Sequence, residues 1–308
     1  MMGEASKIQW TDHTFNPWWG CEKVSPGCKH CYAEQFADKR FHLKVWGAQA
    51  ERRIASNAMW AKPLKWNAAA AKKGQRARVF CASMADVFEK YEGPSWDAVY
   101  KARLRLWQII AATPHLDWLL LTKRPQNVLA MVPGAWLGFD EERRSAWPGN
   151  VWVGCTVENQ EQATKRIPWL LNIPAPVRFL SCEPLLEYVD LTRITCLPSG
   201  ADPQAYLNAL TGHIGGPDDV LPHRINWVII GGESGSNSRS FNPAWADGMV
   251  SQCRSSKVPV FVKQFGSNPT LRSGSGWGCV IGKGDNPDEW PMQLRIRQIP
   301  NADVAKAL

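Results

Sequence analysis

The chain has 308 residues, of which 44% are hydrophobic and 21% are charged, and its formal net charge is +8. This composition is ordinary for a globular protein, and no apolar run reaches the ~18 residues that a membrane span needs, so we expect no membrane segment. The positive charge favours a polyanionic partner, although the basic residues are dispersed along the chain.

Residues 7–14 alternate apolar and polar side chains before Phe15, Asn16 and Pro17 interrupt the run, which predicts a first strand. Apolar and charged residues mix over residues 32–46, as in a partly amphipathic helix. The alanine-rich stretch 62–76 is interpreted as a connection.

Between that strand and that helix lies a loop with the spacing C-x6-C-x2-C, formed by Cys21, Cys28 and Cys31. Pro26 and Gly27 favour a turn before Cys28, so the chain can direct the three sulfurs at one centre. Three thiolates without a close fourth cysteine suit a [4Fe-4S] cluster whose fourth iron stays open for chemistry.

Three other interpretations of these cysteines stay open. Zinc could take the three thiolates together with His30 or His13, because Cys3His sets are tetrahedral zinc ligands. A disulfide is disfavoured by the odd total of nine cysteines and the absence of a secretory segment, which predict reduced thiols in a cytoplasmic protein. Chance clustering of buried cysteines is the third.

Six short, nearly continuous apolar runs follow the loop, and such runs are typical of parallel strands buried on both faces. Helical patterns, with Pro or Asn signals at their starts, lie between several of them at residues 95–112, 159–171 and 242–256. The alternation predicts an α/β fold, a partial (β/α) barrel of six or seven mostly parallel strands. The runs are residues 78–83, 117–122, 151–156, 177–182, 227–232 and 258–263.

The barrel is expected to occupy residues 1–266. Residues 192–225 break the rhythm and are interpreted as an insertion that could serve as a substrate lid. Residues 267–308 are expected to form a small C-terminal extension packed on the barrel.

Polar residues gather where the predicted strands end, at the edge where such barrels carry their reactive groups. Each taken alone would be an ordinary helix cap or turn residue. The set comprises Ser83, Asp86, Thr122, Lys123, Arg124, Thr156, Glu158, Asn159, Ser181, Glu183, Gly232, Glu233, Ser234, Lys263 and Gln264.

Four stretches carry a resemblance over residues 7–266: W-G-C-x6-C-x2-C-Y-A, L-L-L-T-K-R-P, C-T-V-E-N and G-G-E-S-G. With them the chain resembles a phage- and prophage-associated family of the radical S-adenosylmethionine (radical SAM) superfamily. That superfamily usually reads C-x3-C-x2-C with an aromatic beside the last cysteine, whereas here the first spacing is six residues and the aromatic is Tyr32.

The resemblance implies a [4Fe-4S] cluster on the three loop cysteines, bound S-adenosylmethionine, and a reductant such as flavodoxin or ferredoxin. It places Ser83 and Asp86 near the amino group of S-adenosylmethionine and gives Cys155 and Cys182 a role in returning a hydrogen atom. It also implies that the ribose or the carboxylate of S-adenosylmethionine contacts Thr156, Glu158, Ser181 and Glu183. Gly232 and Glu233 would form a glycine-rich turn that contacts a ligand.

The function predicted is an enzyme that generates a 5′-deoxyadenosyl radical and abstracts hydrogen from a substrate. A nucleic-acid base or nucleotide is the expected substrate, because of the net charge, the cations at the strand ends, the phage association, and Trp10, Trp18 and Trp19 around the cysteine loop. Two alternatives remain, a zinc-stabilised nucleic-acid-binding protein without catalysis and a radical SAM enzyme that modifies peptides.

Overall fold

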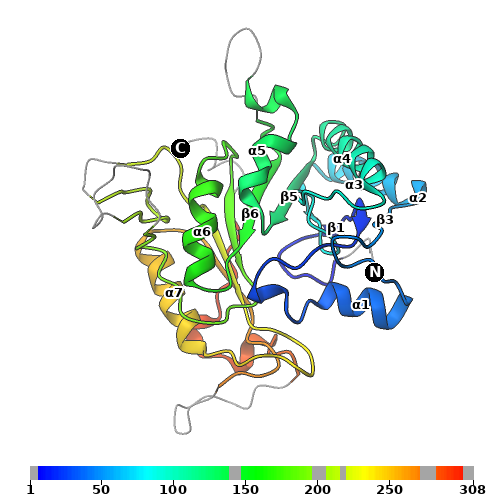
Figure 1. Cartoon of the computed structure of the whole chain (residues 1–308). Helices are drawn as coiled ribbons and strands as arrows, with labels where there is room; N and C mark the ends of the chain where they lie inside the picture. The colour runs from blue at the N-terminus through cyan, green and yellow to red at the C-terminus, as the bar shows by residue number, and fades with distance from the viewer. Residues whose placement is uncertain (1–5, 139–146, 196–205, 216–219, 271–281, 301–308) are drawn as a thin grey trace. The chain divides into compact units, whose positions relative to one another are not determined.

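The computed structural model describes residues 6–138, 147–195, 206–215, 220–270 and 282–300 (Figure 1). The chain divides into two compact units. Unit 1 contains the chain up to Gly154 together with Ile173–Pro176, and unit 2 contains Cys155–Asn172 and the chain from Val177 onward. Among the described residues, no helix is both long and apolar enough to cross a membrane.

Seven strands form one parallel sheet, which confirms the predicted fold class of an α/β partial barrel. Every residue of the three strands β6 (Val151–Thr156), β7 (Arg178–Cys182) and β8 (Trp227–Gly231) is buried, which explains why these segments are mostly apolar instead of alternating. In hydrogen-bonded order the strands are β1 (His13–Thr14), β4 (Ala77–Cys81), β5 (Leu116–Thr122), β6 (Val151–Thr156), β7 (Arg178–Cys182), β8 (Trp227–Gly231) and β9 (Val260–Gln264).

In unit 1, α3 (Lys62–Lys73) packs against β4 and β5. The short strands β2 (Trp18–Trp19) and β3 (Arg53–Ile54) pair antiparallel, and the cysteine loop follows β2 in the chain. The helical elements of the unit are η1 (Pro26–Cys28), α1 (Tyr32–Phe41), α2 (Asn57–Trp60), α3 (Lys62–Lys73), α4 (Trp96–Ala111), η2 (Pro125–Asn127), α5 (Val128–Met131) and η3 (Gly134–Leu137).

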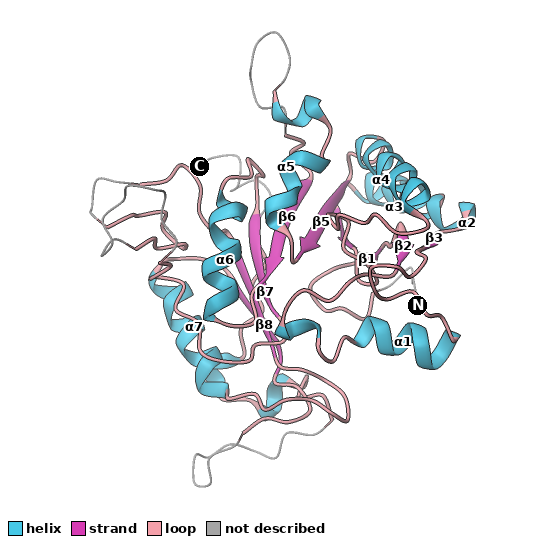
Figure 2. Ribbon diagram, in the orientation of Figure 1, coloured by secondary structure: helices cyan, strands magenta, loops and turns pink. Residues whose placement is uncertain are grey.

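In unit 2, α7 (Pro243–Ser255) packs against β8 and β9 (Figure 2). Its start is the one expected from sequence, because the Asn242 side chain accepts a hydrogen bond from the backbone of Ala244 at 3.0 Å. Asn159 caps α6 (Gln160–Leu171) in the same way. The remaining helical turns of the unit are η4 (Pro287–Glu289) and η5 (Met292–Leu294).

Three predicted elements differ from the structure. The strand expected over 7–14 is reduced to His13–Thr14, because the residues before it turn, with the backbone of Thr11 donating to the Ile8 carbonyl at 3.2 Å. The helix expected over 32–46 ends at Phe41, after which His42 takes a left-handed conformation with φ 54°. The stretch 62–76 is mostly helix, not a connection, since alanine favours helix and Trp66 buries one face.

The predicted insertion and extension are partly described. Within 192–225, Ile194 and Leu207 form an antiparallel bridge and are both buried. In the C-terminal segment, the backbone of Val262 donates to the Ile296 carbonyl at 2.8 Å, so Ile296 lies beside β9. Residues 196–205, 216–219, 271–281 and 301–308 lie outside the described residues. The lid role and the boundary at residue 266 stay predictions.

Candidate metal centre and strand-end polar groups

A glycine fixes the entrance to the cysteine loop. Gly20 has a φ of 115°, and a Cβ atom added to it would lie 2.2 Å from the carbonyl oxygen of Val45. Its backbone N–H donates to the Met84 carbonyl at 3.0 Å, which ties the loop to the segment that follows β4. Only glycine combines this conformation with so close an approach, so Cys21 starts from a fixed position.

The three loop cysteines differ from the other described cysteines in exposure. Cys21, Cys28 and Cys31 are each half-buried, whereas the cysteines elsewhere in the described chain are fully buried. Cys28 closes the short helix η1, and Cys31 immediately precedes α1. Burial raises the pKa of the Cys31 thiol, which the backbone N–H of Glu34 and the charge of Lys123 partly offset.

In the described chain no three His, Cys, Asp or Glu side chains stand close enough together to hold a metal ion. That finding concerns a single ion. The loop offers three partly exposed cysteines, the ligand type of an iron–sulfur cluster, so the chemistry of the donor set fits a cluster.

A buried arginine lies against the first cysteine. Arg124, at the end of β5, has its Nη1 3.7 Å from Cys21 Sγ, and its Nη2 donates to the Glu22 carbonyl at 3.0 Å. Burial raises the pKa of the Cys21 thiol to about 12 with the help of the Glu89 and Asp86 charges, and Arg124 opposes that rise. Cys21 thus lies in a charged, largely dry environment.

Asp86 is the anchor of that arginine. Its carboxylate accepts hydrogen bonds from the Thr122 hydroxyl at 2.7 Å, from the Lys123 backbone at 3.0 Å and from Arg124 Nη1 at 2.9 Å. A fourth hydrogen bond comes from the backbone of Phe88 at 3.0 Å. The predicted contact of Asp86 with the amino group of S-adenosylmethionine stays a prediction. In the structure, the Asp86 oxygens hold Arg124, the arginine that contacts the cysteine loop.

A second buried ion pair supports the first. Arg52 donates to both carboxylate oxygens of Glu89, from Nε at 3.2 Å and from Nη2 at 3.0 Å. Its Nη1 also donates to the backbone carbonyls of Val45, Gly47 and Ala50, at 3.0, 2.9 and 2.7 Å. The pair therefore fastens the chain segment that closes over Gly20.

Ser83 and Tyr32 lie together at the rim of this site. The Tyr32 hydroxyl donates to the Ser83 carbonyl at 2.9 Å, and the Ser83 hydroxyl is 3.1 Å from the side-chain nitrogen of Asn16. Tyr32 is 57% exposed and Ser83 is half-buried, so both can meet a ligand.

Unit 2 contains the other predicted strand-end residues. Arg166 donates from Nη1 to Glu158 at 2.7 Å and to the Thr156 carbonyl at 2.8 Å, and all three residues are buried. Arg166 therefore lies on the inner face of α6, where it neutralises a buried carboxylate.

The strand ends of β7, β8 and β9 form two further ion pairs. Glu183 pairs with Lys263 at 2.7 Å and accepts a hydrogen bond from Ser181 at 3.3 Å. Glu233 accepts two side-chain hydrogen bonds from Arg239, at 3.0 and 2.6 Å. The Glu183–Lys263 pair keeps 14% and 23% of its side-chain surface exposed, which leaves it open to a ligand.

Glycines make these turns possible. A Cβ atom on Gly232 would lie 2.1 Å from the Phe265 carbonyl oxygen, because the strand ends approach each other closely here. The Gln264 side chain donates to the Gly232 carbonyl at 2.9 Å and closes the contact. The predicted glycine-rich turn therefore has a packing role, and its contact with a cofactor stays a prediction.

Cys155 and Cys182 are completely buried. Burial, together with the neighbouring thiols of Cys253 and Cys155, raises the pKa of Cys182 well above its ordinary value. Because side chains alternate along a strand, Cys182 points to the face opposite Ser181 and Glu183. The hydrogen-donating role of the two thiols stays a prediction.

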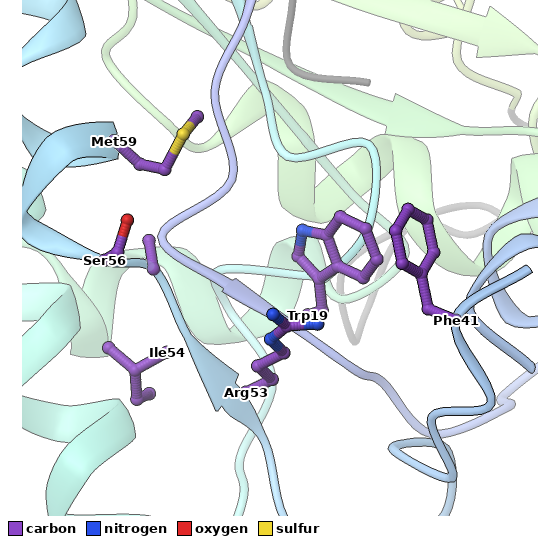
Figure 3. Close-up of a pocket in the computed structure, with 7 residues that line it drawn as sticks. Trp19, Phe41, Arg53, Ile54, Ser56 and Met59 are labelled. Carbon is purple, nitrogen blue, oxygen red and sulfur yellow. The ribbon is translucent and has the colours of Figure 1, made fainter.

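A pocket that the sequence did not reveal lies beside the paired strands β2 and β3 (Figure 3). It has a volume of about 370 Å³. The rings of Trp19 and Phe41 meet edge to face at 5.4 Å, and the guanidinium of Arg53 lies 5.8 Å from the Trp19 ring centre. The remaining lining residues are Ile54, Ala55, Ser56 and Met59.

Sequence reasoning also missed Arg52, Glu89, Arg166 and Arg239 as members of these sites. Each pairs with a residue whose position depends on the fold, such as Arg52 with Glu89, which are 37 residues apart in the chain. The one available signal was the presence of charged residues next to strongly apolar runs, because buried charges are nearly always paired.

The fold and these residues define an α/β partial-barrel protein with a three-cysteine loop. The model of the family "Protein of unknown function (DUF5131)" matches residues 5–285, and the chain belongs to this family. No curated protein sequence matches it.

Among solved structures, the chain is similar to mutants of spore photoproduct lyase. A double mutant with bound AdoMet and dinucleoside spore photoproduct is 11% identical, with a TM-score of 0.38, over 60% of this chain and 48% of that one. A tyrosine-to-phenylalanine mutant is 13% identical, with a TM-score of 0.38, over 58% of this chain and 47% of that one. A cysteine-to-serine mutant is 11% identical, with a TM-score of 0.42, over 91% of this chain and 69% of that one. The match to the first two spans about half of their length.

Proposed function

We propose that the protein is a radical SAM enzyme whose [4Fe-4S] cluster is held by Cys21, Cys28 and Cys31. The observation that carries the proposal is the contrast in exposure: the three cysteines of one loop are partly exposed, while the other described cysteines are buried. Three cysteine ligands leave one iron of such a cluster open for another ligand.

When bound, the cluster and S-adenosylmethionine supply an electron and a 5′-deoxyadenosyl radical that abstracts hydrogen, and flavodoxin or ferredoxin is the reductant expected. The protein's own residues bind and orient. Tyr32 and Ser83 are partly exposed polar residues of unit 1 beside the loop, and their hydroxyl groups can meet the polar groups of S-adenosylmethionine.

Anaerobic reconstitution tests the cluster. We expect about four irons per chain and a visible charge-transfer band. Cys28→Ala should lose both, whereas the matched control Cys253→Ala, which removes a buried thiol in unit 2, should keep them. Stoichiometric zinc and no iron in anaerobically purified protein would contradict the proposal and favour the zinc-stabilised nucleic-acid-binding protein.

Reductive cleavage tests the enzyme class. With dithionite or flavodoxin, the reconstituted protein should release 5′-deoxyadenosine from S-adenosylmethionine. Tyr32→Ala should weaken binding of S-adenosylmethionine because it removes an exposed hydroxyl and ring beside the cysteine loop. Tyr100→Ala, which removes an exposed tyrosine of α4, is the matched control. A cluster-loaded protein that releases no 5′-deoxyadenosine under any reductant would reject catalysis.

For the substrate we propose a nucleotide or nucleic acid. Two observations support this choice, the net charge of +8 and the pocket in which Arg53 stands over the half-exposed Trp19, two residues before Cys21. Stacking of a base on an aromatic side chain contributes about 1–3 kcal/mol, and a nearby arginine adds attraction for phosphate.

Binding of a single-stranded oligonucleotide, measured at several salt concentrations, tests the substrate class. Trp19→Ala and Arg53→Ala should each weaken binding, whereas Trp96→Ala, which removes an exposed tryptophan of α4 outside the pocket, should not. The affinity should fall as salt rises, because phosphate contacts release counterions. Salt-independent binding, or transfer of deuterium into 5′-deoxyadenosine from peptides only, would reject the nucleic acid and favour a peptide substrate.

A further inference from the structure

We infer that Arg124 positions Cys21 and supplies a positive charge beside it, and thereby raises the reduction potential of the cluster; the inference rests on the proposed function. The residue is 7% exposed and its side chain reaches two consecutive residues of the loop, the sulfur of Cys21 at 3.7 Å and the carbonyl of Glu22 at 3.0 Å. One guanidinium therefore holds the first cysteine through both its side chain and the adjoining backbone.

The guanidinium cannot swing away from the sulfur, because other groups fix it. Asp86 accepts from Nη1 at 2.9 Å, and Glu89 lies 3.7 Å from Nη2. The Arg124 backbone N–H donates to the Thr122 hydroxyl at 2.9 Å, and that hydroxyl in turn donates to Asp86. The planar, permanently charged arginine is thus held in one orientation at the end of β5.

The local charges give the contact its electrochemical meaning. Three arginines, Arg52, Arg103 and Arg124, lie near the two carboxylates of Asp86 and Glu89. Arg124 reaches the sulfur of Cys21, so removing it takes a positive charge away from the sulfur and leaves both carboxylates in place. A cluster gains negative charge when it is reduced, and hydrogen bonds and charges around its sulfurs set its potential. Loss of Arg124 should therefore disfavour reduction.

The test is a redox titration of the reconstituted protein, followed by electron paramagnetic resonance. We expect Arg124→Gln to shift the reduction equilibrium about tenfold toward the oxidised cluster, which is ~59 mV for one electron. Arg124→Lys keeps the charge and should restore most of the potential. The matched control is Arg76→Gln, which breaks an arginine–carboxylate pair with Asp117 in the same unit and touches no sulfur.

Loss of iron from Arg124→Gln, with an unchanged circular dichroism spectrum and with iron retained by Arg76→Gln, also supports the inference, because it shows that Arg124 holds Cys21 for binding. If Arg124→Gln does not fold, Asp86→Asn loosens the same guanidinium, and its cluster potential should shift. Equal reduction potentials in the wild type and in Arg124→Gln would overturn this inference and leave the proposed function standing. A wild type that binds no cluster would overturn the proposed function with it.

Discussion

Replacing Arg166 by methionine should destabilise unit 2 by about 3–5 kcal/mol, the usual loss when one partner of a buried ion pair is removed. Arg166 and Glu158 have only 4% and 0% of their side-chain surfaces exposed, with 2.7 Å between Nη1 and Oε2. Methionine fills similar volume but provides no charge and no donor for the Thr156 carbonyl. The variant therefore leaves the Glu158 carboxylate buried without this cation.

Urea unfolding followed by circular dichroism measures the change, because the free energy of unfolding falls linearly with denaturant. The same helix contains a control, the exposed pair of Glu161 and Lys165, whose side chains are 59% and 63% exposed. Lys165→Met should change stability by no more than about 0.5 kcal/mol. The double variant Glu158→Gln with Arg166→Met should recover part of the loss, since no buried charge remains. A loss below about 1 kcal/mol for Arg166→Met would refute the reasoning.

Two further outcomes follow from unit 1. Gly20→Ala should lower the free energy of unfolding clearly more than Gly47→Ala, since both residues have a φ of 115° but only Gly20 would press a Cβ against Val45; equal losses in urea unfolding would contradict the clash. Partial burial alone would raise the pKa of Asp12, but hydrogen bonds and charge from Arg78 outweigh it and lower the pKa. Asp12→Asn should therefore cost at most about 1 kcal/mol at pH 7, a difference that disappears as the pH falls below about 4; a constant difference down to pH 2 would argue against this pair.

The sequence by itself determined the features that depend on near neighbours. Continuous apolar runs predicted the parallel strands, because a strand buried on both faces cannot alternate. The asparagine and proline at 242 and 243 predicted the start of α7, since a cap acts within one helical turn. The loop cysteines were found from their spacing alone.

The tertiary structure decided what those groups touch. Arg124 and Cys21 are 103 residues apart, and their contact exists only because the end of β5 lies next to the loop. Asp86 was expected to face a cofactor, yet its oxygens hold Arg124, since a buried carboxylate is stabilised by whichever donors the fold brings to it. Short-range patterns specify strands and caps, whereas the pairing of buried charges depends on residues far apart in sequence, and only the folded chain brings them together.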